Sequence, residues 1–109
     1  MKIPENAIIP EDKITRYLLV LKTRNDKSKF LAQGGFSDKN PEALKAAIQL
    51  QAIASEAVKD RSNEYGTFYQ VTGDLVGANG VYLSVVTIWL QRNIDGKFQF
   101  VTLKPYKES

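Results

Sequence analysis

The 109-residue chain contains no cysteine and no histidine. Without cysteine there can be no disulfide framework and no thiol nucleophile, and without either residue a zinc site of the usual kind is excluded. The lack of histidine also removes the most common general acid or base, so any catalysis must use Lys, Arg, Tyr, Thr, Ser or carboxylate side chains. The sequence has neither an apolar run that could cross a membrane nor a signal peptide, so we expect a cytoplasmic protein without membrane contacts.

The remaining composition is that of an ordinary globular domain. With 43% hydrophobic and 25% charged residues, the chain is long enough to bury one core, so we expect residues 1–109 to form a single domain. The net charge of +3 is a mild basic excess, which attracts polyanions only where the cations cluster. The sequence has no phosphate-binding glycine loop and no serine-centred elbow, so we expect no cofactor.

Two amphipathic segments predict helices in the first half of the chain. The first covers about 10–22, begins at Pro10 and has one apolar face. The second begins at Pro41, after a potential cap at Asn40, and extends to about Arg61. Its apolar stripe is wide enough for a helix that lies across a sheet. Between the two, residues 27–32 fit a short helical turn that a glycine pair ends.

The sequence from Tyr65 to Tyr106 predicts three strands, with tight hairpin turns at 79–80 and 95–96. Two-residue turns would pair Val71 with Ile88, and one face would then collect Tyr69, Val71, Leu75, Val86, Ile88, Leu90, Val101 and Leu103. We expect the second helix to cover this face. The fold is therefore predicted to be α+β, with two N-terminal helices packed on one face of a three- to four-stranded antiparallel β-meander. A register slip of one residue would exchange the two faces.

The opposite face of the predicted sheet combines an aromatic side chain with hydroxyls and amides. Trp89 would stack a nucleobase there, with Thr87 and Gln70 as polar neighbours. Lys27, from a basic segment that covers 13–29, would arch over one edge and neutralise phosphate. The alternative is that Trp89 belongs to a second small core and that the basic residues form a solvated surface.

Three further residues are candidates for catalysis. Thr102 and Lys104 project from the face of Trp89, near the end of the last predicted strand. With Lys29 they would stabilise the pentacovalent phosphate of a metal-free RNA cleavage. The alternative is an edge strand in which Lys104 and Pro105 prevent pairing with another sheet.

A series of short motifs resembles a small bacterial family, domain of unknown function 6883. The motifs cover nearly the whole chain and include 13–19 (KITRYLL), 27–31 (KSKFL), 35–36 (GF), 65–66 (YG), 77–80 (GANG), Trp89 and 100–105 (FVTLKP). Family members occur as standalone bacterial proteins and as C-terminal domains of polymorphic toxins. The order of helices and strands also resembles metal-independent ribonuclease toxins of the barnase, colicin and RelE type. Many of those ribonucleases use histidine, which this chain lacks. The resemblance therefore implies a mechanism driven by Lys, Arg or Tyr.

The sequence leaves two function classes open. In the first, the domain binds RNA or is a metal-independent ribonuclease of toxin type. In the second, it is a non-enzymatic interaction module that binds a small cognate protein through the open face of its sheet. Whether the domain is an enzyme is not decided by the sequence.

Overall fold

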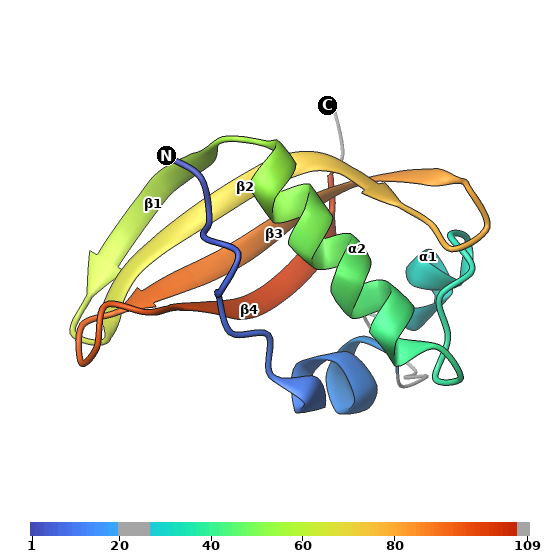
Figure 1. Ribbon diagram of the computed structural model, residues 1–109, viewed down its shortest axis with the longest axis horizontal. Coiled ribbons are helices and arrows are strands. Elements are labelled where there is room, and N and C mark those ends of the chain that lie inside the picture. The colour runs from blue at the N-terminus through green and yellow to red at the C-terminus, as the bar shows by residue number, and fades with distance from the viewer. Residues whose placement is uncertain (20–26, 107–109) are drawn as a thin grey trace.

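The computed structural model describes residues 1–19 and 27–106, and the side chains of Arg16, Tyr17 and Lys27 also lie outside the description. The described residues form three helical segments followed by four strands (Figure 1). The helical segments are η1 (Lys13–Leu18), α1 (Lys27–Ala32) and α2 (Pro41–Ala54), and the strands are β1 (Ala57–Asn63), β2 (Gly66–Val76), β3 (Tyr82–Arg92) and β4 (Phe98–Pro105). The sheet is antiparallel in the order β1-β2-β3-β4, so the predicted α+β class and meander are confirmed.

Helix α2 lies across one face of the sheet, here called the covered face (Figure 1). Its buried stripe is Leu44, Ala47, Ile48, Gln51 and Ala52. The apolar members join one cluster with Val71, Leu75, Leu83, Val85, Trp89, Phe100 and Leu103 from the strands, and with Ile14, Leu18, Leu31 and Phe36 from the segments before α2. Because each fully buried side chain of this size contributes roughly 1.5–3 kcal/mol, this single core dominates the stability of the domain.

The first nine residues run beside α2 and span the sheet from one edge to the other (Figure 1). At one end, the backbone N–H of Ala57 donates to the carbonyl oxygen of Met1 at 2.6 Å. The Met1 amine also lies 2.9 Å from Glu56, and this hydrogen bond and positive charge lower the pKa of the glutamate. At the other end, Ile8 forms a parallel bridge with Gln99. The lead-in therefore closes the outer edge of β4.

A chain of hydrogen bonds crosses the core beneath α2. The Nε2 atom of Gln51 donates to the carbonyl oxygen of Val71 at 2.9 Å. The Thr87 hydroxyl donates to Oε1 of Gln51 at 2.8 Å, and the Trp89 indole N–H donates to the Thr87 hydroxyl at 2.9 Å. Gln51, Thr87 and Trp89 are all buried, so these bonds replace the water that burial removes.

The register of β2 and β3 differs by one residue from the prediction. Val71 lies opposite Thr87, and not opposite Ile88. The cause is the connection, which is a five-residue loop over 77–81, closed by a hydrogen bond from the N–H of Gly77 to the carbonyl of Val81 at 2.7 Å. An odd change in loop length turns every side chain of β3 to the opposite face. The prediction that Ile88 and Leu90 lie under α2 is therefore wrong, and Thr87 and Trp89 lie there instead.

Strand β4 contains a bulge that also changes its faces. Ile88 pairs with Thr102 and Trp89 pairs with Phe100, which leaves Val101 as the extra residue. The bulge reverses the alternation at this point, so that Phe98, Phe100 and Leu103 all join the core cluster. Val101 is only half-buried, and its predicted place in the core is wrong.

The helices also differ from the prediction in length and number. The second predicted helix begins at Pro41 as expected but ends at Ala54, and residues 57–61, assigned to its last turns, belong to β1. The first consists of π-helical turns up to Leu18, with Leu19 N–H bonded to the Ile14 carbonyl at 3.1 Å, and its predicted end at residue 22 lies outside the described residues. Residues 27–32 form α1, as the sequence indicated.

Candidate nucleic-acid interface

The face of the sheet that points away from α2 is here called the open face. The buried apolar residues of the described helices and of the lead-in all join the core cluster on the covered side. The open face carries side chains from all four strands, which are Arg61, Phe68, Gln70, Ile88, Leu90, Gln99, Thr102 and Lys104. Val86, also on this face, is buried but stands outside the core cluster.

Strand pairing arranges these side chains in three rows across the open face. The first row is Arg61, Phe68, Leu90 and Gln99; the second is Val58, Gln70, Ile88 and Thr102; the third is Thr72, Val86 and Lys104. Neighbouring strands lie about 4.8 Å apart, and side chains two residues apart on one strand are about 7 Å apart. The face therefore alternates hydroxyl and amide groups with apolar ones, and has cations at opposite corners.

The Arg61 guanidinium lies over the ring of Phe68, with its central carbon 5.3 Å from the ring centroid. A cation over an aromatic face is held by the ring quadrupole and keeps its donors pointing outward. Within the described part of the chain, neither Arg61 nor Lys104 forms an ion pair. Asp74 lies on β2 opposite Ser84, in the row next to that of Thr72, Val86 and Lys104. Its carboxylate accepts a hydrogen bond from the Ser84 hydroxyl at 3.3 Å.

The structure brings together some of the predicted site residues and separates others. Gln70, Thr102 and Lys104 lie on the open face, on adjacent rows. Trp89 is only 1% exposed and Thr87 is fully buried, so the premise that they belong to an accessible face is wrong.

The two predicted lysines of the first half of the chain do not join these rows. Lys29 is exposed on α1, which packs into the covered side through Leu31. The side chain of Lys27 lies outside the described residues.

Arg61 and Phe68 lie on the open face but are not among the predicted site residues. The prediction places Arg61 at the end of a helix and gives Phe68 no role. The available signal was the turn between them, where the Asn63 side chain accepts hydrogen bonds from the backbone N–H groups of Tyr65 and Gly66 at 2.8 and 3.3 Å. An Asn followed three residues later by Gly is a turn signature, and it would have indicated a hairpin.

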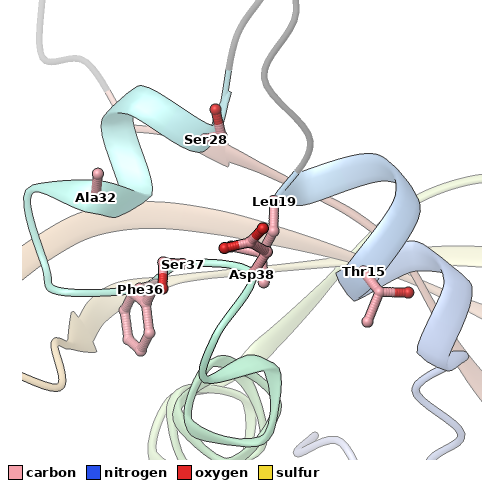
Figure 2. A pocket seen from close by; sticks show the side chains of 7 residues that line it. All are labelled: Thr15, Leu19, Ser28, Ala32, Phe36, Ser37 and Asp38. Atoms are coloured by element: carbon pink, nitrogen blue, oxygen red, sulfur yellow. The ribbon is translucent and has the colours of Figure 1, made fainter.

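A hollow of about 580 Å³ lies on the other side of the molecule, between η1, α1 and the loop that precedes α2 (Figure 2). Its apolar lining is Leu19, Ala32 and Phe36, and its polar lining is Thr15, Ser28, Ser37 and Asp38. The carboxylate of Asp38 lies in the space between the two helical segments, and the Ser28 side chain projects from the start of α1 (Figure 2). Among the described residues, this lining therefore offers hydroxyls and one carboxylate.

The described residues contain no group of three or more His, Cys, Asp or Glu side chains that could hold a metal ion. None of the described helices is long and apolar enough to span a membrane.

The fold and the open face define a small α+β domain in which helices cover one side of a four-stranded meander. The chain belongs to the family Domain of unknown function (DUF6883), whose model matches residues 2–107. The predicted family is thereby confirmed.

Comparison with individual proteins adds a structural relative. No curated protein sequence matches the chain. Among solved structures, it is similar to a chain of a contact-dependent growth inhibition toxin–immunity protein complex from Klebsiella pneumoniae 342. The TM-score is 0.67 and the identity 20%, over 92% of this chain and 100% of that chain. At this identity the similarity establishes a shared fold.

Proposed function

We propose that this domain acts on RNA, and that it binds a single strand across the open face and cleaves it as a metal-independent ribonuclease of toxin type. The observation that carries the proposal is the combination of the Arg61–Phe68 pair with Thr102 and Lys104 on one sheet face that no described helix covers. Antiparallel sheets that bind single strands typically use aromatic rings for bases and cations for phosphates.

Binding follows from the chemistry of the rows. Phe68 and the guanidinium plane of Arg61 offer a platform on which a base stacks, and the guanidinium also offers donors to a phosphate. Lys104 lies two rows away and provides a second positive charge for the backbone. The amide of Gln70 lies between them and offers both a donor and an acceptor.

Cleavage would proceed by attack of the ribose 2′-oxygen on the neighbouring phosphorus, with the 2′-hydroxyl proton passing to solvent water. The new O–P bond forms as the bond to the 5′-oxygen breaks, which leaves a cyclic phosphate and a 5′-hydroxyl. Lys104 stabilises the additional negative charge on the pentacovalent phosphate, and Thr102, on the same β-strand, donates to one of its oxygens. Arg61, at the opposite corner of the face, holds a different phosphate of the same RNA strand. In a chain without histidine, Lys104 is also the candidate to protonate the leaving oxygen.

The toxin assignment has separate support. The family that the sequence resembles includes C-terminal domains of polymorphic toxins, and the similar solved structure is a contact-dependent growth inhibition toxin–immunity protein complex. Both are consistent with a toxin domain.

The test uses fluorescence anisotropy with labelled single-stranded RNA and a gel assay for cleavage in EDTA. We expect the wild-type protein to bind and cleave, because EDTA removes no required group. Arg61→Ala and Lys104→Ala should each weaken binding by about 1–2 kcal/mol, and Lys104→Ala should slow cleavage further, since charge grows in the transition state. Lys45→Ala, an exposed lysine on α2, and Lys29→Ala on α1 are controls that should have little effect. Absence of both binding and cleavage by the wild type at low salt would contradict the proposal.

The second candidate is a non-enzymatic module that binds a small cognate protein through the open face. The observation in its favour is that the similar chain comes from a complex of two proteins. This candidate predicts that Arg61→Ala weakens binding of the partner and that the wild type leaves RNA intact. High-level expression in bacteria without toxicity favours it, whereas toxicity that Lys104→Ala relieves favours the ribonuclease.

A further inference from the structure

A second hollow lies at the end of the sheet where the β1–β2 and β3–β4 turns meet. Its volume is about 520 Å³, and its lining includes Glu64, Tyr65, Leu90, Arg92, Ile94 and Gln99. Leu90 and Gln99 belong to the first row of the open face, so the hollow continues directly from the Arg61–Phe68 pair. We call it the turn-end hollow.

Hydrogen bonds between the two turns fix the shape of the turn-end hollow. The backbone N–H of Asn93 donates to the Tyr65 carbonyl at 3.0 Å, and its side-chain amide donates to the Glu64 carbonyl at 3.2 Å. Gly66 comes next in the chain, and a Cβ there would run into the carbonyl oxygen of Gln91. The two turns are therefore held together tightly, and the hollow is formed before any ligand arrives.

The polar floor of the turn-end hollow is also fixed. Arg92 lies 3.1 Å from the Asp95 carboxylate and donates from its other terminal nitrogen to Oε1 of Gln99 at 3.4 Å. The Asp95 carboxylate in turn accepts the backbone N–H of Lys97 at 3.0 Å. This arrangement occupies the Gln99 oxygen, and among the described residues no partner takes the Gln99 amide nitrogen. Its two N–H donors remain for a ligand.

The walls of the turn-end hollow are apolar and exposed. Tyr65 is 67% exposed and Ile94 is 85% exposed, although side chains of this size usually lie in the interior. A flat ligand that fills the hollow would cover part of both, with its edge within reach of the Gln99 amide. The Arg61 guanidinium, two positions from Leu90 along the first row, suits a negative charge attached to such a ligand.

We infer that the turn-end hollow binds one unpaired nucleobase of an RNA strand whose phosphates lie along the open face. A nucleobase is flat, has apolar faces and carries donors and acceptors on its edge, which are the three features that the lining complements. The inference rests on the proposed RNA function and adds the position and chemistry of base recognition. Leu90 and Val86 are four residues apart on β3, so the hollow and the row of Lys104 are about 13 Å apart.

The test compares Tyr65→Ala with Tyr82→Ala. Tyr82 lies at the opposite end of the sheet and is 66% exposed, which makes it a matched control for loss of an exposed tyrosine. The probes are labelled oligouridine and oligoadenosine of equal length, and an abasic oligonucleotide that keeps the phosphates. Thermal unfolding of each variant checks the fold, which loss of an exposed side chain should leave unchanged.

We expect Tyr65→Ala to weaken binding of the base-bearing probes by about five- to 150-fold, the range that base–aromatic stacking provides. It should leave the weaker binding of the abasic probe unchanged, and Tyr82→Ala should change neither. Gln99→Leu, which keeps the size but removes the donors, should alter the ratio of affinities for the two base-bearing probes. If the wild type binds RNA and the Tyr65→Ala and Tyr82→Ala variants bind the base-bearing probes with equal affinity, the inference is overturned and the RNA function stands. If the wild type binds no probe, both are overturned.

Discussion

Trp89 illustrates, at the scale of one residue, what decides which side of this sheet is buried. Strand β3 is apolar on both faces, since Leu83 and Val85 alternate with Val86 and Ile88. Periodicity therefore could not distinguish the two faces, and only the loop length set the register. The buried position of Trp89 is stabilised by the Thr87 hydroxyl, which supplies a partner for the indole N–H.

The first stability prediction compares the two sides of β3. Trp89→Ala should lower the free energy of unfolding by about 3–5 kcal/mol, because it removes a large buried ring and leaves a cavity. Ile88→Ala should cost about 1 kcal/mol, because its side chain is half-exposed on the open face. Urea unfolding followed by circular dichroism measures both. An equal or greater loss for Ile88→Ala would place Ile88, and not Trp89, under α2.

At the scale of elements, the sequence predicted the helix that starts at Pro41, the short turn at 27–32 and three strands. It did not predict β1, because the alanine-rich segment before it favours helix and six of its seven residues are exposed. A strand without an apolar face has no alternation to detect, and it forms because it pairs with β2. The missed strand explains why Arg61 was absent from the predicted site while Gln70, Thr102 and Lys104 were in it.

The β1–β2 hairpin depends on Gly66. Its φ is +156°, and a Cβ there would collide with the backbone of β3 at Gln91. Gly96 also has a positive φ, of +71°, but a Cβ there meets nothing within 4 Å.

These two glycines allow a matched stability prediction. Gly96→Ala should lower the free energy of unfolding by roughly 1–2 kcal/mol, which is the strain of an L-residue with a positive φ. Gly66→Ala should lower it more, since β2 must also move away from β3 at Gln91. Thermal unfolding of both variants provides the comparison, and equal losses would show that the contact with Gln91 relaxes without cost.

At the scale of the whole molecule, the sheet has a covered side and an open side. The described helices and the lead-in all pack on the covered side, and the lead-in also closes the outer edge of β4. The open side carries cations without ion-pair partners among the described residues. A net charge of +3 adds a general attraction for polyanions, but the placement of Arg61 and Lys104 decides where an RNA strand would lie on the sheet.

The last prediction tests this placement through the salt dependence of RNA binding. For single strands, the logarithm of the binding constant falls with the logarithm of salt concentration by about 0.7 for each phosphate neutralised. Arg61→Ala and Lys104→Ala should therefore each flatten the slope by about 0.7, and the double variant by about twice as much. Lys45→Ala removes the same charge from the exposed surface of α2 and should leave the slope unchanged, although it lowers the net charge equally. Anisotropy titrations at several salt concentrations measure the slopes. If Lys45→Ala flattened the slope as much as Lys104→Ala, the net charge alone would govern binding. The prediction that the RNA phosphates contact the open face would then be wrong.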